Sequence, residues 1–278
     1  MMLGTDATMS QTYVHGYGSR ERARLQDQAD ALAALLHADT GYAAGSRVLE
    51  AGCGIGAQTV SLARRSPGAR IVALDLSRES VMAARGKVTT AGLTNVEFLQ
   101  ADLFALPFRP QAFDHAFVCF VLEHLSRPID TLVALRDLVR PGGTVTVIEG
   151  DHGSAYFHPD SNAAREAIRC QVELQRAAGG NALIGRQLYP LLREARLEAV
   201  RVSPRMVYVD SSRPELVEGF TRRTFTAMIE GVRDRAIQTG LATPERFDAG
   251  IRALYRTAEA DGVFCYTFFK AVGEIPRR

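Results

Sequence analysis

The segment Val48–Val60 (VLEAGCGIGAQTV) places three glycines within five positions, directly after an apolar run that contains one carboxylate. Glycine reaches backbone angles that other residues avoid, and its missing side chain lets a ligand lie against the main chain. Where a strand of a parallel sheet meets its helix, such a loop and the first amides of the helix bind ligands. The glycine pattern alone fits either a dinucleotide or an adenosylated amino acid.

Two features of this segment discriminate between the two ligands. A dinucleotide fingerprint has the spacing G-x-G-x-x-G, whereas Gly52, Gly54 and Gly56 are spaced as G-C-G-I-G. Glu50 lies two residues before the first glycine, where its carboxylate would repel a pyrophosphate and attract an ammonium group. Both features favour S-adenosylmethionine as the cofactor.

Two further carboxylates follow apolar runs farther along the chain. Asp75 ends the run ARIVALD, where its oxygens can accept hydrogen bonds from the ribose diol of either ligand. Asp102 follows the run VEFLQ, where it can accept from an adenine amino group while Leu103 and Phe104 pack on the ring. In an open parallel sheet the ligand lies at the carboxyl ends of the strands, so we expect the three carboxylates to surround one ligand.

Short apolar runs alternate with helical patterns between Arg47 and Asp151. The runs are nearly continuous, as strands buried on both faces require, and the alternation predicts a parallel sheet with helices on both sides. Ser77 is the predicted N-cap of one of these helices. The predicted strands have the sequences RVLEAG, ARIVALD, VEFLQAD, FDHAFVCF and GTVTVIEG.

The remainder of the chain has a looser pattern. It predicts helices over residues 161–178, 187–196, 214–238 and 244–260, one bent strand or two over 197–210 with an interruption at Pro204, and a closing strand over 263–270. The helical stretch 211–261 does not fit into the sheet, and we expect it to cap one end. The predicted organisation is an N-terminal arm and helix (1–40), a core (41–210 and 262–278) and a helical cap (211–261).

The composition argues against several classes of protein. The 278 residues include 33 basic and 31 acidic side chains, so the net charge of +2 leaves no excess of positive charge for a nucleic acid partner. Four cysteines without a CxxC pair disfavour a zinc site and a disulfide scaffold. No apolar run approaches the roughly 18 residues of a membrane span, and the N-terminus lacks the pattern of a signal peptide. We expect a cytoplasmic protein that needs no metal, membrane or nucleic acid.

Over Arg47–Gly150 the chain resembles the class I S-adenosylmethionine-dependent methyltransferases. The motifs that carry the resemblance are EAGCGIG, Asp75, Ala101-Asp102 with the following LPF turn, the strand FDHAFVCFVLEH, and LVRPGGTVTVIE. The chain is similar to the branch that includes the ubiquinone and menaquinone C-methyltransferases and small-molecule tailoring enzymes. The strings TYVHGYGSRE and IEGDHGSAYFHP also resemble a microbial subgroup that methylates indole or terpenoid natural products.

The resemblance implies a fold and a set of cofactor contacts. The fold is a Rossmann-like α/β fold with a seven-stranded, mostly parallel sheet, whose last strand, Val263–Lys270, runs antiparallel between its neighbours. The implied contacts come from Glu50, Gly52, Cys53, Gly54 and Gly56 for the methionine part, Asp75 and Leu76 for the ribose, Ala101, Asp102 and Leu103 for the adenine, and Cys119 and Phe120 beneath the sulfonium.

The candidates for the methyl acceptor side lie in the segment IEGDHGSAYFHP. Methyl transfer from a sulfonium is an in-line displacement, so correct positioning of the acceptor provides most of the catalysis. We expect His152 to act as the base or to orient the acceptor, with Glu149 and Asp151 setting its tautomer and Tyr156 lining the pocket. The alternative is that Asp151 caps a turn and His152 only bonds a loop carbonyl.

Several other residues are candidates for substrate contact. His124 could face the site or serve as packing at a helix start, and Arg205 and Tyr208 could touch the substrate or lie on a solvated strand. Tyr13 and Tyr17 could belong to an N-terminal lid over the cofactor or to a disordered leader. Such an arm could close the site of its own chain or that of a neighbour in a homo-oligomer.

Three functions are compatible with these patterns. The first is methylation of a small, largely apolar metabolite at carbon, nitrogen or oxygen, because Phe220, Phe225 and Met228 of the predicted cap could line an apolar pocket. The second is a non-catalytic module that holds the cofactor as a structural ligand. The third is a nucleic acid methyltransferase, which usually carries an N-P-P-Y motif where this chain has CFVLEH.

Overall fold

The computed structural model describes Arg24 and residues 32–277. Tyr13, Tyr17 and most of the predicted N-terminal arm lie outside the described residues. Residues 32–37 are helical, and the chain enters the first strand of the sheet at Arg47.

Eight strands form one sheet in the order β3-β2-β1-β4-β5-β8-β6, and β7 pairs with β8. Strands β1 to β5 are parallel, and β8 runs antiparallel between β5 and β7, which confirms the predicted place of the last strand. The strands are β1 (Arg47–Ala51), β2 (Arg70–Asp75), β3 (Val96–Gln100), β4 (Phe113–Cys119), β5 (Val139–Gly150), β6 (Tyr156–His158), β7 (Glu198–Val209) and β8 (Val263–Glu274).

The prediction of seven strands was wrong because it did not include the short strand β6. The pairing of β8 with β5 ends at Phe268 opposite Gly150, so the first residues of β8 extend beyond the end of β5. The short strand β6 pairs with this extension over Val263–Cys265. An uncovered strand edge presents unpaired backbone groups, and β6 satisfies them. The region predicted as one bent strand or two is the single strand β7, with Pro204 opposite Phe269.

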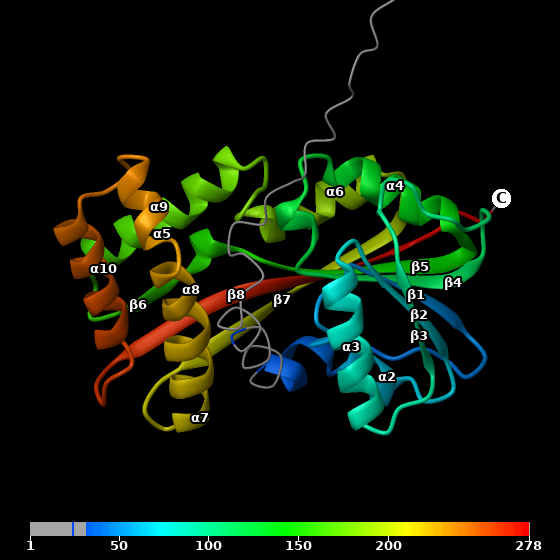
Figure 1. The fold of residues 1–278 in the computed structure, drawn as a ribbon, viewed down its shortest axis with the longest axis horizontal. Coiled ribbons are helices and arrows are strands. Elements are labelled where there is room, and N and C mark those ends of the chain that lie inside the picture. Colours follow the sequence, from blue (N-terminus) through cyan, green and yellow to red (C-terminus); the bar gives the residue numbers. More distant parts are fainter. Residues whose placement is uncertain (1–23, 25–31, 278) are drawn as a thin grey trace, which may run out of the picture.

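Helices cover both sides of the parallel strands, and a second group surrounds the far end of β8 (Figure 1). The Ser77 hydroxyl accepts from the Ser80 amide at 3.2 Å, as the predicted N-cap of α3 requires. The α-helices are α2 (Thr59–Arg65), α3 (Arg78–Thr90), α4 (Pro128–Leu138), α5 (Asn162–Ala177), α6 (Leu188–Glu194), α7 (Pro214–Leu216), α8 (Ala227–Glu230), α9 (Arg233–Gln238) and α10 (Pro244–Arg256). Short 3₁₀ turns are η1 (Leu122–His124), η2 (His152–Ser154) and η3 (Ile184–Gln187).

The helix predicted over residues 214–238 is not continuous. Its central part, η4 (Val217–Thr226), is a π-helix, and a break at Gly231 and Val232 separates α8 from α9. In a π-helix, residues five positions apart lie on one face. Phe220 and Phe225 therefore both face β8, where each ring packs against Phe264. The contacts of Phe220 and Phe225 with β8 thus occur in a π-helix, which the α-helical period of 3.6 residues does not predict.

The core consists of two clusters, one associated with each side of the sheet. One cluster joins the N-terminal helix, α2 and α3 to the aromatic residues of β8 and η4. The other joins α4 and α6 to strands β1, β4 and β5. The first cluster contains Phe220, Phe225 and Met228, which the sequence analysis assigned to an apolar pocket for the substrate.

Candidate active site

The glycine loop after β1 is packed too closely for side chains. Gly52 has φ +76°, and a Cβ atom there would lie 2.6 Å from Cγ2 of Val121. Gly56 has φ +80°, and a Cβ atom there would lie 2.8 Å from Cα of Ala84 in α3. Both positions therefore require glycine. The loop is held between the segment after β4 and helix α3, which brings its backbone to the carboxyl ends of the central strands.

Glu50 is a buried carboxylate at the entrance to this loop. Its exposed fraction is 3%, and its Oε2 has no hydrogen-bond partner. Burial raises the pKa of Glu50 to about 7, and the nearby charge of Asp75 adds to this effect. An acidic oxygen that is buried without a partner costs free energy unless a ligand satisfies it. The site therefore fits a cationic group, such as the ammonium of an amino acid.

Asp75 connects the glycine loop to α3. Its Oδ2 accepts from the Gly54 amide at 2.9 Å, and its Oδ1 accepts from the Ser77 amide at 2.9 Å. Burial raises the pKa of Asp75, while these backbone hydrogen bonds oppose the change. Each carboxylate oxygen can accept a second hydrogen bond, so Asp75 can also bind a diol.

The segment after β3 forms the predicted adenine side. The Ala101 amide donates to the backbone carbonyl of Asp75 at 3.1 Å, which ties this segment to the end of β2. Asp102 is exposed, and its Oδ1 accepts from the Phe104 amide at 2.9 Å. Leu76 is 68% exposed, and Leu103 is partly buried against the core. The surface therefore consists of two apolar side chains, Leu76 and Leu103, and the exposed carboxylate of Asp102.

The turn after β4 is strained and is held by Glu149. Phe120 has φ +57°, a value that is unusual for a bulky residue and that marks functional sites in many proteins. Glu149 is fully buried, and its Oε1 accepts from the amides of Val121 at 3.0 Å and Leu122 at 2.7 Å. Burial raises the pKa of Glu149 well above its usual range. Glu149 therefore positions the backbone beside Cys119 and Phe120, and it forms no hydrogen bond with His152.

His152 lies in an aromatic environment and has a different partner from those expected. Its Nδ1 is 2.7 Å from the hydroxyl of Tyr266, and its ring contacts the ring of Phe225 at 6.2 Å between centroids. Its exposed fraction is 6%, and burial lowers its pKa. Sequence reasoning missed Tyr266, which lies on the closing strand. The available signal was the alternation in VFCYTFF, which places Phe264, Tyr266 and Phe268 on one face of that strand.

Asp151 stabilises the turn at the start of η2 and forms no side-chain hydrogen bond with the ring of His152. Its Oδ1 accepts from the Gly153 amide at 3.0 Å, and its two oxygens accept from Arg186 at 2.6 and 2.8 Å. This is the arrangement that the alternative prediction described, in which Asp151 caps a turn. The bidentate pair fixes the start of η2, where the backbone of His152 also bonds the Ala182 carbonyl.

Two other predicted residues, Tyr156 and Tyr208, lie outside this aromatic environment. Tyr156 is 56% exposed and contacts Met206 through its hydroxyl, on the face of β6 opposite to the face that meets the aromatic cluster. Tyr208 is 41% exposed on β7. The ring of His124 has its Nε2 3.6 Å from Glu123 Oε1. The structure does not bring Tyr156 or Tyr208 to His152.

Arg205 belongs to a charged cluster that anchors the end of the N-terminal helix. Asp39 accepts from Arg205 and, at 2.7 Å, from the ammonium of Lys270, which also donates to Thr40 at 2.6 Å. Lys270 is 4% exposed, and burial lowers its pKa. Burial opposes ionisation of Asp39, but the hydrogen bonds from Lys270 and Arg205 outweigh this effect and lower its pKa to about 2.

Replacing Asp39 by Asn is expected to destabilise the fold by about 1–2 kcal/mol, because Lys270 would keep a buried charge without its carboxylate. The folded pKa of Asp39 is depressed, so its contribution is present above the ordinary pKa near 3.8 and is lost as the pH falls through about 2. Chemical unfolding from pH 6 to pH 2 measures this loss. Asp130→Asn, at an exposed surface pair, is the control and should change stability by less than about 0.5 kcal/mol. An equal loss in both variants would contradict the prediction.

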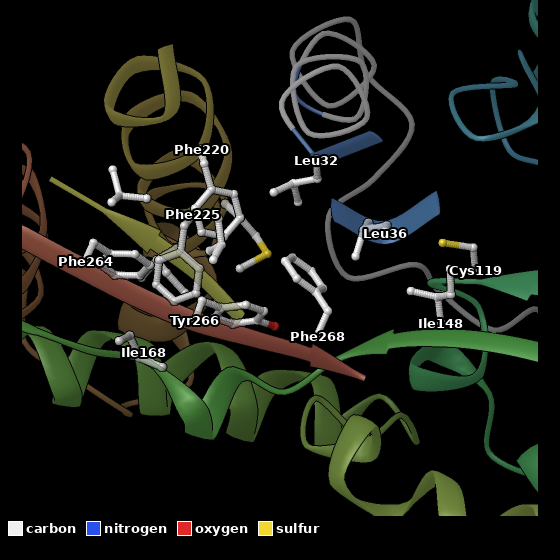
Figure 2. Close-up of a cluster of buried hydrophobic side chains, with 14 of the residues drawn as sticks. Leu32, Leu36, Cys119, Ile148, Ile168, Phe220, Phe225, Phe264, Tyr266 and Phe268 are labelled. Atoms are coloured by element: carbon white, nitrogen blue, oxygen red, sulfur yellow. The ribbon is translucent and has the colours of Figure 1, made fainter. Parts of the chain in front are cut away.

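Figure 2 shows how the buried cluster is arranged around β8. Phe264, Tyr266 and Phe268 project from the strand toward Phe220 and Phe225 of η4. A second part of the same cluster contains Leu32 and Leu36 of the N-terminal helix, Ile148 of β5 and Cys119 of β4. The end of β4 and the surroundings of His152 therefore belong to one continuous apolar region.

No group of three or more His, Cys, Asp or Glu side chains gathers into a metal site within the described part of the chain. The four cysteines are buried free thiols. Among the helices of residues 32–277, none has the length and apolarity needed to span a membrane.

The sheet order, the antiparallel strand β8 and the glycine loop at the end of β1 define the Rossmann-like class I methyltransferase fold. A family model described as a methyltransferase domain matches residues 48–143. An uncharacterised 37.1 kDa protein in transposon TN4556 of Streptomyces fradiae is 32% identical over 190 residues, which is 67% of this chain and 54% of that protein. Demethylmenaquinone methyltransferase of Thermus thermophilus is 35% identical over 103 residues, 37% of this chain and 46% of that protein.

The solved structures agree on the fold. Phosphoethanolamine N-methyltransferase 2 of Haemonchus contortus, solved in complex with S-adenosyl-L-methionine, superposes with a TM-score of 0.55 at 18% identity over 89% of this chain and 52% of that chain. The chain therefore matches a methyltransferase domain over residues 48–143 and has the Rossmann-like class I methyltransferase fold. It spans about half the length of the curated relatives that it matches first.

Proposed function

We propose that this protein binds S-adenosylmethionine and methylates a small, largely apolar metabolite. The observation that carries the proposal is the buried Glu50, whose Oε2 lacks a partner directly before the glycine loop. The Thr59 hydroxyl lies close enough to lower the pKa of Glu50, but it forms no hydrogen bond with this oxygen, and an amino acid ammonium would. The family relationship supports the same cofactor.

The residues of the site have distinct tasks in this proposal. Glu50 would hold the ammonium, Asp75 the ribose diol, and Asp102 the adenine amino group, while Gly52 and Gly54 admit the ligand to the backbone. Cys119 and Phe120 would lie beneath the reacting centre, on the backbone that Glu149 holds in place. When bound, the cofactor supplies an electrophilic methyl group on a positively charged sulfur.

The acceptor side favours an apolar molecule. The rings of Phe220, Phe225, Tyr266 and Phe268 are each at most 3% exposed and belong to the same buried cluster as Cys119. Phe225 and Tyr266 contact His152, and Phe220 and Phe268 pack against Tyr266. Aromatic walls of this kind exclude water and hold a planar or branched hydrocarbon skeleton. Positioning of the acceptor on the axis of the leaving sulfur would then provide most of the rate increase.

Two measurements test the proposed function. Calorimetry should detect binding of S-adenosylmethionine and of S-adenosylhomocysteine to the full chain. Incubation with methyl-labelled S-adenosylmethionine and a panel of aromatic and prenylated acceptors should transfer the label to an organic product. Failure to bind either ligand would exclude the proposal. Binding without transfer to any acceptor would favour the alternative of a non-catalytic cofactor-binding module.

A further inference from the structure

Tyr266 and His152 form a buried pair whose geometry depends on a neighbouring glycine. The hydroxyl of Tyr266 lies 2.7 Å from Nδ1 of His152, and the two residues are 2% and 6% exposed. A Cβ atom on Gly150 would collide with the Tyr266 hydroxyl, so the last residue of β5 leaves room for this contact. The two rings also pack against each other, with centroids 5.8 Å apart. Strand β5, turn η2 and strand β8 thus fix the pair from three directions.

The surroundings determine the direction of this hydrogen bond. Burial raises the pKa of Tyr266 well above its usual range, so its hydroxyl keeps its hydrogen, and the hydrogen bond that this buried hydroxyl makes within the described residues is the one with Nδ1 of His152. The hydroxyl hydrogen is therefore left for Nδ1 of His152. Burial also lowers the pKa of His152, so the ring is neutral near pH 7. A neutral imidazole whose Nδ1 accepts a hydrogen bond carries its own hydrogen on Nε2.

The charged groups around His152 do not outweigh the effect of burial, so the imidazole ring stays neutral near pH 7. Glu123 favours the protonated ring, whereas Arg24 and His124 disfavour it, and burial has the largest effect. Within the described residues, the hydrogen bond to Tyr266 is the one that the imidazole ring makes. The Nε2 hydrogen is therefore available to a bound molecule.

A chain of ring contacts connects this pair to the end of β4. Phe120 contacts Phe268 at 5.5 Å between centroids, Phe268 contacts Tyr266 at 4.7 Å, and Tyr266 contacts His152. Phe120 is the strained residue beneath the predicted position of the reacting methyl group. The His152 ring and the predicted methyl position thus border the same aromatic region.

We infer that Tyr266 holds His152 in the Nε2–H tautomer, and that His152 uses this hydrogen to orient an acceptor through one of its lone pairs. The inference rests on the proposed function and names its substrate class: an apolar molecule with a carbonyl, ether or hydroxyl oxygen, or a neutral ring nitrogen, near the methylated atom. In this tautomer Nε2 has no lone pair and Nδ1 is occupied by the phenol. His152 is then a hydrogen-bond donor to the acceptor, and it does not remove a proton from it.

Nuclear magnetic resonance of the full chain with ¹⁵N-labelled histidine, bound to S-adenosylhomocysteine, tests the tautomer directly. At pH 7 the Nδ1 of His152 should have the chemical shift of an unprotonated nitrogen, and Nε2 that of a protonated one. Tyr266→Phe keeps the ring packing but removes the hydroxyl, and it should give a mixture of tautomers. Tyr208→Phe, on an exposed side chain, is the matched control and should leave the spectrum of His152 unchanged. An Nδ1–H tautomer in the native protein, or no effect of Tyr266→Phe, would overturn the inference.

A methylation assay distinguishes the roles of donor and base. His152→Gln places an amide N–H near the position of Nε2, whereas His152→Ala removes the donor. Loss of an oriented donor at a reacting group typically reduces kcat by about 100-fold, so we expect such a loss for the alanine variant and recovery to within about tenfold for the glutamine variant. If both variants lose activity equally, and if the native rate falls at low pH with the titration of a single base, His152 is a base and the inference is wrong.

The two proposals fail in different ways. Absence of cofactor binding would remove the proposed function, and the tautomer of His152 in the free protein would still be measurable. Cofactor binding and methylation with a freely exchanging His152 tautomer would leave the proposed function intact and exclude the role of Tyr266.

Discussion

Replacing Glu50 by Gln should weaken binding of S-adenosylmethionine by about 3 kcal/mol, or on the order of 100-fold, because the glutamine cannot provide a negative charge for the buried ammonium. The same substitution should stabilise the free protein at pH 8. Burial raises the pKa of Glu50 to about 7, so its ionisation opposes folding. Glu97→Gln, on the exposed side of β3, is the control for both measurements. If Glu50→Gln lowered both the affinity for S-adenosylmethionine and the stability of the free protein, Glu50 would have a structural role instead.

The binding should also depend on pH in a defined direction. The folded pKa of Glu50 lies above its ordinary value near 4.5, so the penalty of ionisation is absent below that value and reaches about 3 kcal/mol above pH 7. An ammonium ligand requires the ionised form, so affinity should rise as the pH increases through about 7. Below pH 7 binding should release a proton, which calorimetry in buffers of different ionisation enthalpy detects. A pH-independent affinity from pH 6 to pH 8 in the native protein would contradict this account.

The geometry around the glycine loop could be predicted from the sequence because its determinants are local. Gly52 and Gly56 have positive φ angles and lie so close to neighbouring residues that a side chain would not fit. The spacing of these glycines after an apolar run indicates such a loop from the sequence alone. Asp75 ends β2 and Asp102 follows the end of the neighbouring strand β3, and parallel strands bring their carboxyl ends to one edge. From β1 to the end of β3, the strand pattern, the turn residues and the positions of the carboxylates therefore all indicate the same fold.

The acceptor side could not be predicted in the same way because its contacts join distant segments. The partner of His152 is fixed by the register of β8 against β5, which sequence periodicity does not give. The two amides that Glu149 binds depend on the positive φ of Phe120, which is unusual for a phenylalanine. The π-helix that directs Phe220 and Phe225 at β8 also departs from the regular helical period. In each case tertiary packing overrides the local pattern.

Replacing Asp75 by Ala should reduce the affinity for S-adenosylmethionine by about 3–5 kcal/mol, which is a loss of two orders of magnitude or more. The alanine would remove the acceptors for the Gly54 and Ser77 amides and also the predicted partner of the ribose diol. Asp75→Asn separates these contributions. Its single carbonyl oxygen can satisfy one of the two amides, so the glycine loop should be held in part and the loss of affinity should be intermediate.

Calorimetric affinity and thermal stability of the two variants should be compared with those of Asp234→Ala, whose side chain is 85% exposed. If Asp75 only held the loop, the loss of affinity in each variant would be no larger than its loss of stability, and Asp75→Asn would recover both in the same proportion. If Asp75 also binds the ribose, ligand-induced stabilisation of Asp75→Ala should be much smaller than that of the native protein, because the contact is lost in the bound state itself. Unchanged affinity in Asp75→Ala would mean that the ribose lies elsewhere. Because Asp75, Glu50 and the glycine loop converge at the carboxyl ends of β1 and β2, that outcome would also remove the geometric basis for a single adenosylated ligand.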